Sequence, residues 1–239
     1  MLEPKSTILT PFQKEVLVFF ANLKDSQHFF LTGGMALAEF YLGHRKSFDL
    51  DMFTSEKELI LPFSRVLEEE MQKVFSVQVT KRFETFVEYE IAIKTESIKI
   101  QLVYDSPFHL DSPSESIFGV KINSYKDLTT DKLQAFFGRM EPRDAVDLFF
   151  ILKTEDFWQL CQQAQQKDPG FDLYWLAIAL SKVKDFPDDI KQWPVEMIVE
   201  VDVPGLKKYF SNLSAQIMDN IHALKKITAQ TLGQSVDNQ

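Results

Sequence analysis

The chain has little cysteine and no long apolar run, and both absences exclude whole classes of protein. Cys161 is the single cysteine among 239 residues, so an internal disulfide framework or a cysteine-rich metal centre is excluded. The longest apolar runs, such as residues 148–152, are far shorter than the ~20 residues that cross a bilayer. The first residues also lack the apolar core of a secretory signal. These absences predict a cytoplasmic protein.

Positive charge is also scarce. The 35 Asp and Glu residues exceed the 26 Lys and Arg residues, which gives a formal net charge of −9. This balance argues against a protein that coats nucleic acid by general charge attraction. It is still compatible with a local basic site around a nucleotide, for which the candidates are His44, Arg45, Lys46, Lys126, Lys132, Arg139 and Arg143. Of these, His44 is expected at the surface.

Apolar residues are abundant, and their spacing changes along the chain. Hydrophobic residues make up 45% of the sequence and include 22 Phe, enough for a substantial core. Alternating apolar and polar residues predict antiparallel strands, and helical spacing predicts helices. The predicted strands cover residues 28–32, 47–54, 76–82, 85–93 and 97–104. We therefore predict an α+β domain over residues 1–123, followed by a helical domain over residues 124–239.

The aromatic residues of the helical half form a stripe. We interpret them as core or subdomain interface rather than as a platform for stacking bases. They are Phe157, Trp158, Phe171, Tyr174 and Trp175.

A glycine pair and two aspartates form the most informative motif. Gly33 and Gly34 follow an apolar run, and a turn without side chains lets the backbone approach a phosphate group. Asp49 and Asp51 are two residues apart in a predicted strand, so their side chains point to the same face. Adjacent carboxylates repel each other unless a cation lies between them, and Mg²⁺ with a bound triphosphate is the usual solution. The motif therefore predicts a metal–nucleotide site.

Two further motifs follow, Asp131-Lys132-Leu133 and Arg143-Asp144-Ala145-Val146-Asp147. The order of the motifs resembles the nucleotidyltransferase superfamily, and more narrowly the AbiEii/AbiGii family of type IV toxins, over roughly residues 25–155. The resemblance implies a mixed β-sheet flanked by helices and a C-terminal helical bundle that closes the nucleotide cleft. It also implies metal-dependent transfer of a nucleoside monophosphate from an NTP to an acceptor hydroxyl.

The same resemblance assigns roles to individual residues. Asp49 and Asp51 would bind Mg²⁺ or Mn²⁺, while Lys132 and Asp144 would be catalytic. Contacts to the nucleotide would come from Gly33, Gly34, Arg45, Ser47, Lys132 and Arg143. Asp147 would fix an arginine in the helical layer. The acceptor would be RNA, such as a tRNA end, and the biological role that of a toxin or of phage defence, with a cognate antitoxin as partner.

Alternatives stay open at several of these positions. The superfamily usually has a third carboxylate where this chain has Gln101, with Glu88, Glu90 or Asp105 as substitutes. A degraded relative that binds nucleotide, RNA or a protein without chemistry is therefore an alternative, as is an interaction module whose acidic surface contacts a basic partner. Arg45 could instead pair with an aspartate, Lys132 could be a surface lysine, and Asp144 could serve the helix dipole.

Overall fold

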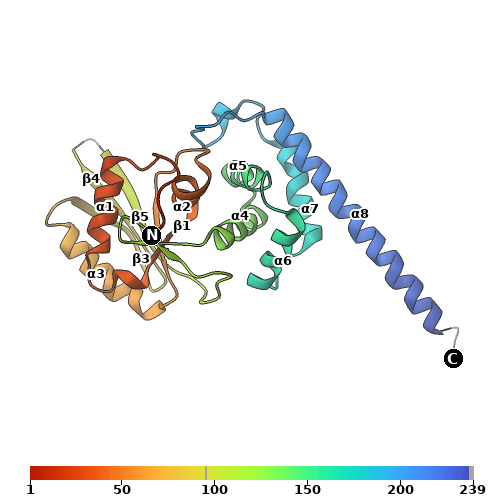
Figure 1. Ribbon diagram of the computed structural model, residues 1–239, viewed down its shortest axis with the longest axis horizontal. Coiled ribbons are helices and arrows are strands. Elements are labelled where there is room, and N and C mark those ends of the chain that lie inside the picture. The colour runs from red at the N-terminus through yellow and green to blue at the C-terminus, as the bar shows by residue number, and fades with distance from the viewer. Residues whose placement is uncertain (95, 237–239) are drawn as a thin grey trace. The chain divides into compact units, whose positions relative to one another are not determined.

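The computed structural model describes residues 1–94 and 96–236, with the side chains of the last helix described to residue 226 (Figure 1). The chain forms two compact units. The first unit contains Met1–Lys132 and Glu196–Val199, and the second unit contains Leu133–Val195 and Glu200–Gln239. Within the described ranges, no helix is long and apolar enough to span a bilayer.

The first unit is built on one mixed sheet in the strand order β3-β4-β5-β2-β1-β7-β6. β2 runs parallel to β5 and antiparallel to β1, and β1 runs parallel to β7. The three alternating segments form the predicted antiparallel ladder β3-β4-β5, which is thereby confirmed. The strands are β1 (Phe30–Thr32), β2 (Leu50–Thr54), β3 (Ser76–Phe83), β4 (Phe86–Ile93), β5 (Glu96–Tyr104), β6 (Ser114–Glu115) and β7 (Lys121–Ile122).

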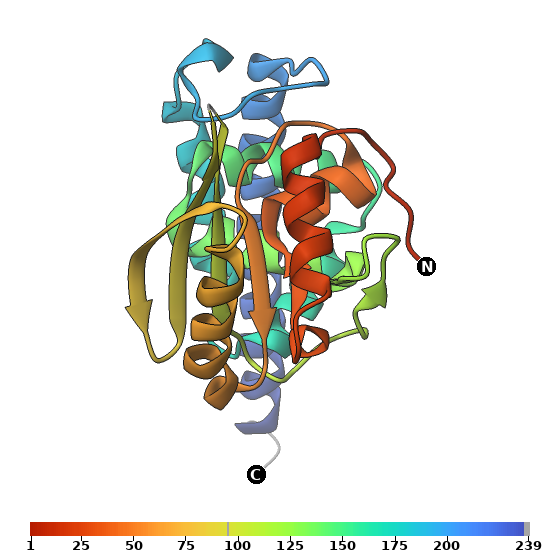
Figure 2. The ribbon, with the colours of Figure 1, turned by 90° about the vertical axis from the view of Figure 1, so that its left-hand side faces the viewer.

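Two helices cover one face of this sheet. α1 (Pro11–Ala21) begins at Thr10, whose side chain accepts a hydrogen bond from the Gln13 N–H in a capping box. α3 (Ile60–Met71) lies on the same side of the sheet as α1 (Figure 2). The rings of Phe20 and Phe63 pack edge to face between the two helices. The Tyr89 hydroxyl also donates a hydrogen bond to the Ser64 carbonyl oxygen of α3.

The alternation of the strands separates an apolar face from a polar one. One face of β2, β4 and β5 carries buried apolar side chains, which are Leu50, Met52, Val87, Tyr89, Ile91, Ile98, Ile100 and Leu102. Side chains at the intervening positions point to the opposite face because successive residues of a strand alternate. That second face carries Asp51, Gln101 and Glu88 on neighbouring strands.

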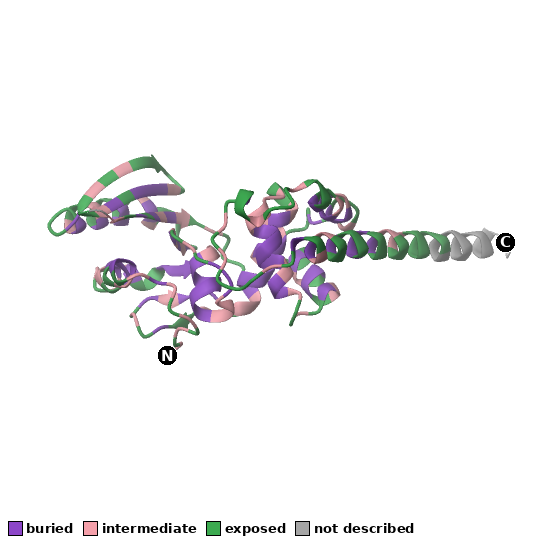
Figure 3. Cartoon of the chain, turned by 90° about the horizontal axis from the view of Figure 1, so that it is seen from above, coloured by how far each residue is buried: buried purple, intermediate pink, exposed green. Residues whose placement is uncertain are grey.

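The second unit is helical. Besides the end of α4 (Tyr125–Arg139), it contains α5 (Pro142–Ile151), α6 (Phe157–Lys167), α7 (Leu173–Ser181) and α8 (Val203–Val236). The first turns of α8 pack along α7, where the Ser214 hydroxyl donates to the Ala177 carbonyl oxygen at 2.7 Å. Figure 3 shows the change from buried to exposed along α8; its buried apolar side chains are Val203, Leu206, Phe210, Leu213 and Ile217.

The aromatic stripe is only partly core. Phe157 and Phe171 are buried as predicted. By contrast, Tyr174 is 44% exposed and Trp175 is 61% exposed, so these two do not belong to the core of the second unit. Both residues lie in the first turn of α7. This helix begins at Asp172, whose carboxylate accepts a hydrogen bond from the Trp175 N–H as the N-cap.

Cys161 gives a first testable prediction. Its thiol is buried in α6, and burial raises its pKa to about 12 because the thiolate would lose its hydration. The thiolate is the reactive form, so at pH 8 we expect no reaction of the folded protein with Ellman's reagent. Unfolding in guanidinium should release one equivalent of the coloured thiolate per chain. Fast reaction under native conditions would show that α6 opens locally.

Candidate active site

The glycine turn lies directly against Asp51. β1 ends at Thr32, the register partner of Asp51 on β2, and the chain then enters the short helix α2 (Gly33–Leu37). Gly33 has φ +70°, in the left-handed region that favours glycine. A Cβ atom on Gly33 would lie 2.1 Å from Asp51 Oδ2. The absence of a side chain at this position therefore makes room for the Asp51 carboxylate.

Gly34 has a different neighbour. A Cβ atom at this position would lie 2.9 Å from Arg45 Nη2 and 2.9 Å from Ser47 Oγ. The Arg45 guanidinium group and the Ser47 hydroxyl therefore both lie beside Gly34, where a side chain would be. Arg45 is buried, and its Nη1 donates to the Lys46 carbonyl oxygen at 2.9 Å. Two of the predicted nucleotide contacts thus lie next to the turn that was predicted to approach a phosphate.

The two aspartates differ in their surroundings. Asp51 lies within β2, but Asp49 precedes the strand, which begins at Leu50, so the prediction of a strand over residues 47–54 is wrong at its start. Both side chains are half-buried. Within the described part of the chain, the Asp49 carboxylate has no hydrogen-bond or ion-pair partner. A half-buried carboxylate without such a partner is suited to binding a cation from outside.

Gln101 occupies the position beside Asp51 on β5. On its other side it pairs with Glu88 of β4, and Gln101 Nε2 donates to Glu88 Oε2 at 3.0 Å. The hydrogen bond from Thr80 Oγ1 to Glu88 Oε1 lowers the pKa of this carboxyl, as does the nearby Lys81 ammonium. Glu88 is therefore ionised at neutral pH.

The other two suggested substitutes for a third carboxylate lie elsewhere. Glu90 is exposed and is paired in register with Lys99 rather than Gln101. Asp105 follows the last residue of β5, and its backbone N–H donates to the Thr54 carbonyl oxygen. Among the three, Glu88 alone lies next to Gln101.

The donor set fits one magnesium ion. Among the described side chains, those of residues 1–94 and 96–226, no three from His, Cys, Asp or Glu are grouped so that they could hold a metal. Mg²⁺ in enzymes is commonly bound by one or two carboxylates, with phosphate oxygens and waters completing its octahedron. Asp51, whose carboxylate lies beside Gly33, and Asp49, two residues before it and half-buried, supply two such carboxylates.

The burial of two basic residues contradicts one prediction and one alternative. His44 is fully buried rather than at the surface, because its carbonyl oxygen accepts from the N–H groups of Ile198 and Val199, both at 3.0 Å. Lys132 is buried in α4, which contradicts the alternative of a surface lysine. It belongs to the same unit as the two aspartates.

Arg143 and Asp144 lie in the second unit. Asp144 is fully buried and accepts two hydrogen bonds from Arg139, at 2.6 Å from Nε and 2.8 Å from Nη2. This bidentate pair raises the pKa of Arg139. Arg143 Nε donates to Glu141 at 2.6 Å. Asp144 thus fixes Arg139. Asp147, for which we predicted such a role, is also fully buried in α5, and its charge also raises the pKa of Arg139.

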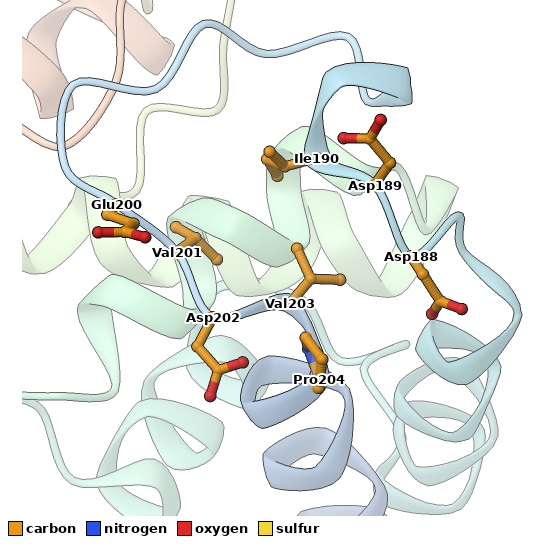
Figure 4. A pocket seen from close by; sticks show the side chains of 8 residues that line it. All are labelled: Asp188, Asp189, Ile190, Glu200, Val201, Asp202, Val203 and Pro204. Atoms are coloured by element: carbon orange, nitrogen blue, oxygen red, sulfur yellow. The ribbon is translucent and has the colours of Figure 1, made fainter.

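A hollow of about 660 Å³ lies in the second unit, away from the residues predicted for the site (Figure 4). Four carboxylates border it, but three already serve the local structure. Asp188 pairs with Lys207 at 2.6 Å, while Asp189 and Asp202 accept backbone N–H groups at the starts of helical segments. The fourth is Glu200. The hollow contains none of the predicted site residues.

Comparison with known proteins identifies the family. The sequence model described as "Nucleotidyl transferase AbiEii toxin, Type IV TA system" matches residues 16–193. The chain therefore belongs to the AbiEii nucleotidyltransferase toxin family. A search of curated proteins gives no match.

Solved structures support the fold. A candidate nucleotidyltransferase from H. pylori is similar, with a TM-score of 0.59 and 21% identity over 89% of this chain and 96% of that one. JHP933 from Helicobacter pylori gives a TM-score of 0.52 and 20% identity over 89% and 93% of the two chains. At these identities the likeness establishes the nucleotidyltransferase-like fold.

Proposed function

We propose that the protein transfers a nucleoside monophosphate from an NTP to an acceptor hydroxyl. The observation that carries this proposal is the arrangement around the glycine pair. The Asp51 carboxylate lies where a Gly33 side chain would be, and the Arg45 and Ser47 side chains lie where a Gly34 side chain would be. One carboxylate, one guanidinium group and one hydroxyl therefore surround a turn that carries no side chains.

Each group has a distinct task in this proposal. Arg45 and Ser47 donate hydrogen bonds to phosphate oxygens beside Gly34, and Lys132 adds a point charge for the triphosphate. Asp49 and Asp51 hold Mg²⁺ or Mn²⁺. When bound, such an ion neutralises the charge that develops on the phosphate and orients it for in-line displacement.

The reaction exchanges one bond to phosphorus for another. The acceptor hydroxyl forms a bond to the α-phosphorus and gives up its proton to solvent water, while the bond from that phosphorus to the α–β bridging oxygen breaks. Pyrophosphate leaves with the electrons of that bond. Because the bidentate pair with Arg139 occupies Asp144, we assign Asp144 the task of positioning Arg139 rather than that of taking the proton.

The acceptor and the partner are proposed from the resemblance to the family. We propose an RNA acceptor, such as a tRNA end, a cytoplasmic toxin or phage-defence role, and a cognate antitoxin as partner. A chain with a net charge of −9 does not attract RNA over its whole surface. Recognition of RNA would therefore depend on a few local contacts, and its affinity should fall only weakly with salt concentration.

The direct test is label transfer. Each of four α-labelled NTPs is incubated with the protein, Mg²⁺ or Mn²⁺, and total cellular RNA and protein. We expect label from one or more nucleotides to appear in a discrete RNA band, and chelation by EDTA to remove it. Absence of label with a folded protein, across all four nucleotides and both metals, would contradict the proposal.

A non-catalytic relative is the alternative, and Gln101 in place of an acid is the observation that favours it. Binding measurements separate the two functions. The enzyme should bind an NTP much more tightly with Mg²⁺ than in EDTA, because the metal bridges the nucleotide to Asp49 and Asp51. Equal affinity under both conditions would favour the non-catalytic relative.

A further inference from the structure

A row of polar side chains crosses four strands on the polar face of the sheet. Asp51 of β2 pairs in register with Gln101 of β5, which pairs in turn with Glu88 of β4. Residues that pair across adjacent strands present their side chains on the same face. Thr80 of β3 completes the row, because its hydroxyl donates to Glu88 Oε1 at 2.8 Å. The row thus connects the candidate metal site with the edge strand.

The surroundings of Glu88 determine how the Gln101 carboxamide is turned. Glu88 Oε1 accepts from Thr80 and lies 3.4 Å from Lys81 Nζ, while Glu88 Oε2 lies 3.0 Å from Gln101 Nε2. An ionised carboxylate can only accept hydrogen bonds. The NH₂ group of Gln101 must therefore face Glu88.

This orientation leaves the carbonyl oxygen of Gln101 pointing away from Glu88. The next strand on that side is β2, with Asp51 as the register partner of Gln101. Carboxamide oxygens are ordinary ligands of hard divalent cations. With the opposite orientation, the NH₂ group would face the cation and repel it. Glu88 therefore selects the only orientation of Gln101 that suits a metal site.

We propose that Gln101 is a neutral third oxygen ligand for the metal held by Asp49 and Asp51, and that Glu88 is the positioning residue that fixes its carboxamide. This inference rests on the proposed nucleotidyl transfer site. It also identifies Glu88 as the residue that carries the negative charge absent from position 101. Glu88 keeps that charge on the same face but two strand spacings, or about 10 Å, from Asp51.

Exchanging the two side chains tests this directly. The variant E88Q/Q101E keeps an amide–carboxylate hydrogen bond and the total charge, but moves the charge from β4 to β5, next to Asp51. We expect Mn²⁺, titrated by EPR with inorganic tripolyphosphate present, to bind about tenfold or more tightly than in the wild type. A stabilising role confined to the Glu88–Gln101 pair would leave the Mn²⁺ affinity unchanged.

The single variant E88Q tests the positioning role. A neutral Gln at position 88 can donate as well as accept, so the Gln101 carboxamide is no longer held in one orientation. Loss of a group that orients a metal ligand costs about 10- to 100-fold in metal affinity, and we expect the lower end of that range. E90Q is the matched control, because Glu90 is exposed on the same strand and pairs with Lys99. Its Mn²⁺ affinity should equal that of the wild type.

The outcomes separate this inference from the proposed function. If label transfer occurs but neither E88Q nor the exchange variant changes the Mn²⁺ affinity, Gln101 is not a metal ligand and the proposed nucleotidyl transfer is retained. If the Mn²⁺ affinities change as expected but no label is transferred from any NTP, the proposed metal ligands are retained and the proposed nucleotidyl transfer is wrong. Unfolding in urea shows whether each variant is folded, and the exchange variant retains the test if E88Q is not.

Discussion

Replacing Asp49 or Asp51 by asparagine should reduce nucleotidyl transfer by about 10³-fold or more, with little loss of stability. A bound metal supplies several kcal/mol of charge stabilisation in phosphoryl chemistry, and each factor of ten in rate corresponds to about 1.4 kcal/mol. Asparagine has the same shape as aspartate, so the space beside Gly33 stays filled as before. Removing one of two neighbouring negative charges also relieves repulsion when no metal is bound. Label transfer and urea unfolding, measured on the same preparations, give both quantities.

Asp105→Asn is the control for this pair of variants. Asp105 is also acidic and lies just past the end of β5, but its carboxylate accepts from the Ser106 N–H instead of facing the glycine turn. Its transfer rate should be within about twofold of the wild type, since it holds no metal or phosphate. Full activity of Asp49→Asn or Asp51→Asn would place the catalytic metal elsewhere.

Gly33→Ala should damage the site through the backbone and through Asp51 together. A non-glycine residue at φ +70° costs about 1–2 kcal/mol of stability. The new methyl group would also lie 2.1 Å from Asp51 Oδ2, so the carboxylate must move away. A displacement of about 1 Å in a catalytic site costs about 10²-fold in rate. We therefore expect a loss of about that size, measured as label transfer at saturating NTP.

Gly138→Ala provides the contrasting glycine substitution. Gly138 lies within α4, and a Cβ atom there has no atom of the described structure within 4 Å. Alanine is the better helix former by about 1 kcal/mol, so this variant should be more stable than the wild type and equally active. If Gly33→Ala behaved like Gly138→Ala, the close approach of Asp51 to the turn would not matter for function.

Much of the first unit could be predicted because its signals are local. Alternation fixes which side chains of β3, β4 and β5 face the core, and the Thr10–Pro11 pair marks the start of α1. The glycine pair and the spaced aspartates were predicted to contribute to one site, and the Asp51 carboxylate lies where a Gly33 side chain would be. These features depend on residues close in sequence or on a single strand pairing.

What could not be predicted depends on contacts between distant segments. The segment of His44 is covered by Ile198 and Val199, more than 150 residues away, whose N–H groups donate to the His44 carbonyl oxygen. The spacing of apolar residues in the sequence does not predict such a long-range pairing. The exposure of Trp175 is also not encoded in its residue type, which usually favours burial. The pairing of Glu88 with Gln101 follows from the register of β4 against β5, whereas the sequence alone offered three acidic residues as substitutes for the third carboxylate.

The segment Glu196–Val199 belongs to the first unit, although the residues on both sides of it belong to the second, and this limits how the protein can be cut into fragments. This segment belongs to the first unit, where Met197 bridges to Arg45 and the Glu196 carbonyl oxygen accepts from the Lys46 N–H. A fragment that ends after α4 would contain both aspartates and both glycines but would lose the backbone partner of the Arg45 loop. Neither half is therefore a transferable module. Any chimera between relatives must exchange this four-residue segment together with the glycine turn, or the loop that carries Arg45 will lose its backbone partners.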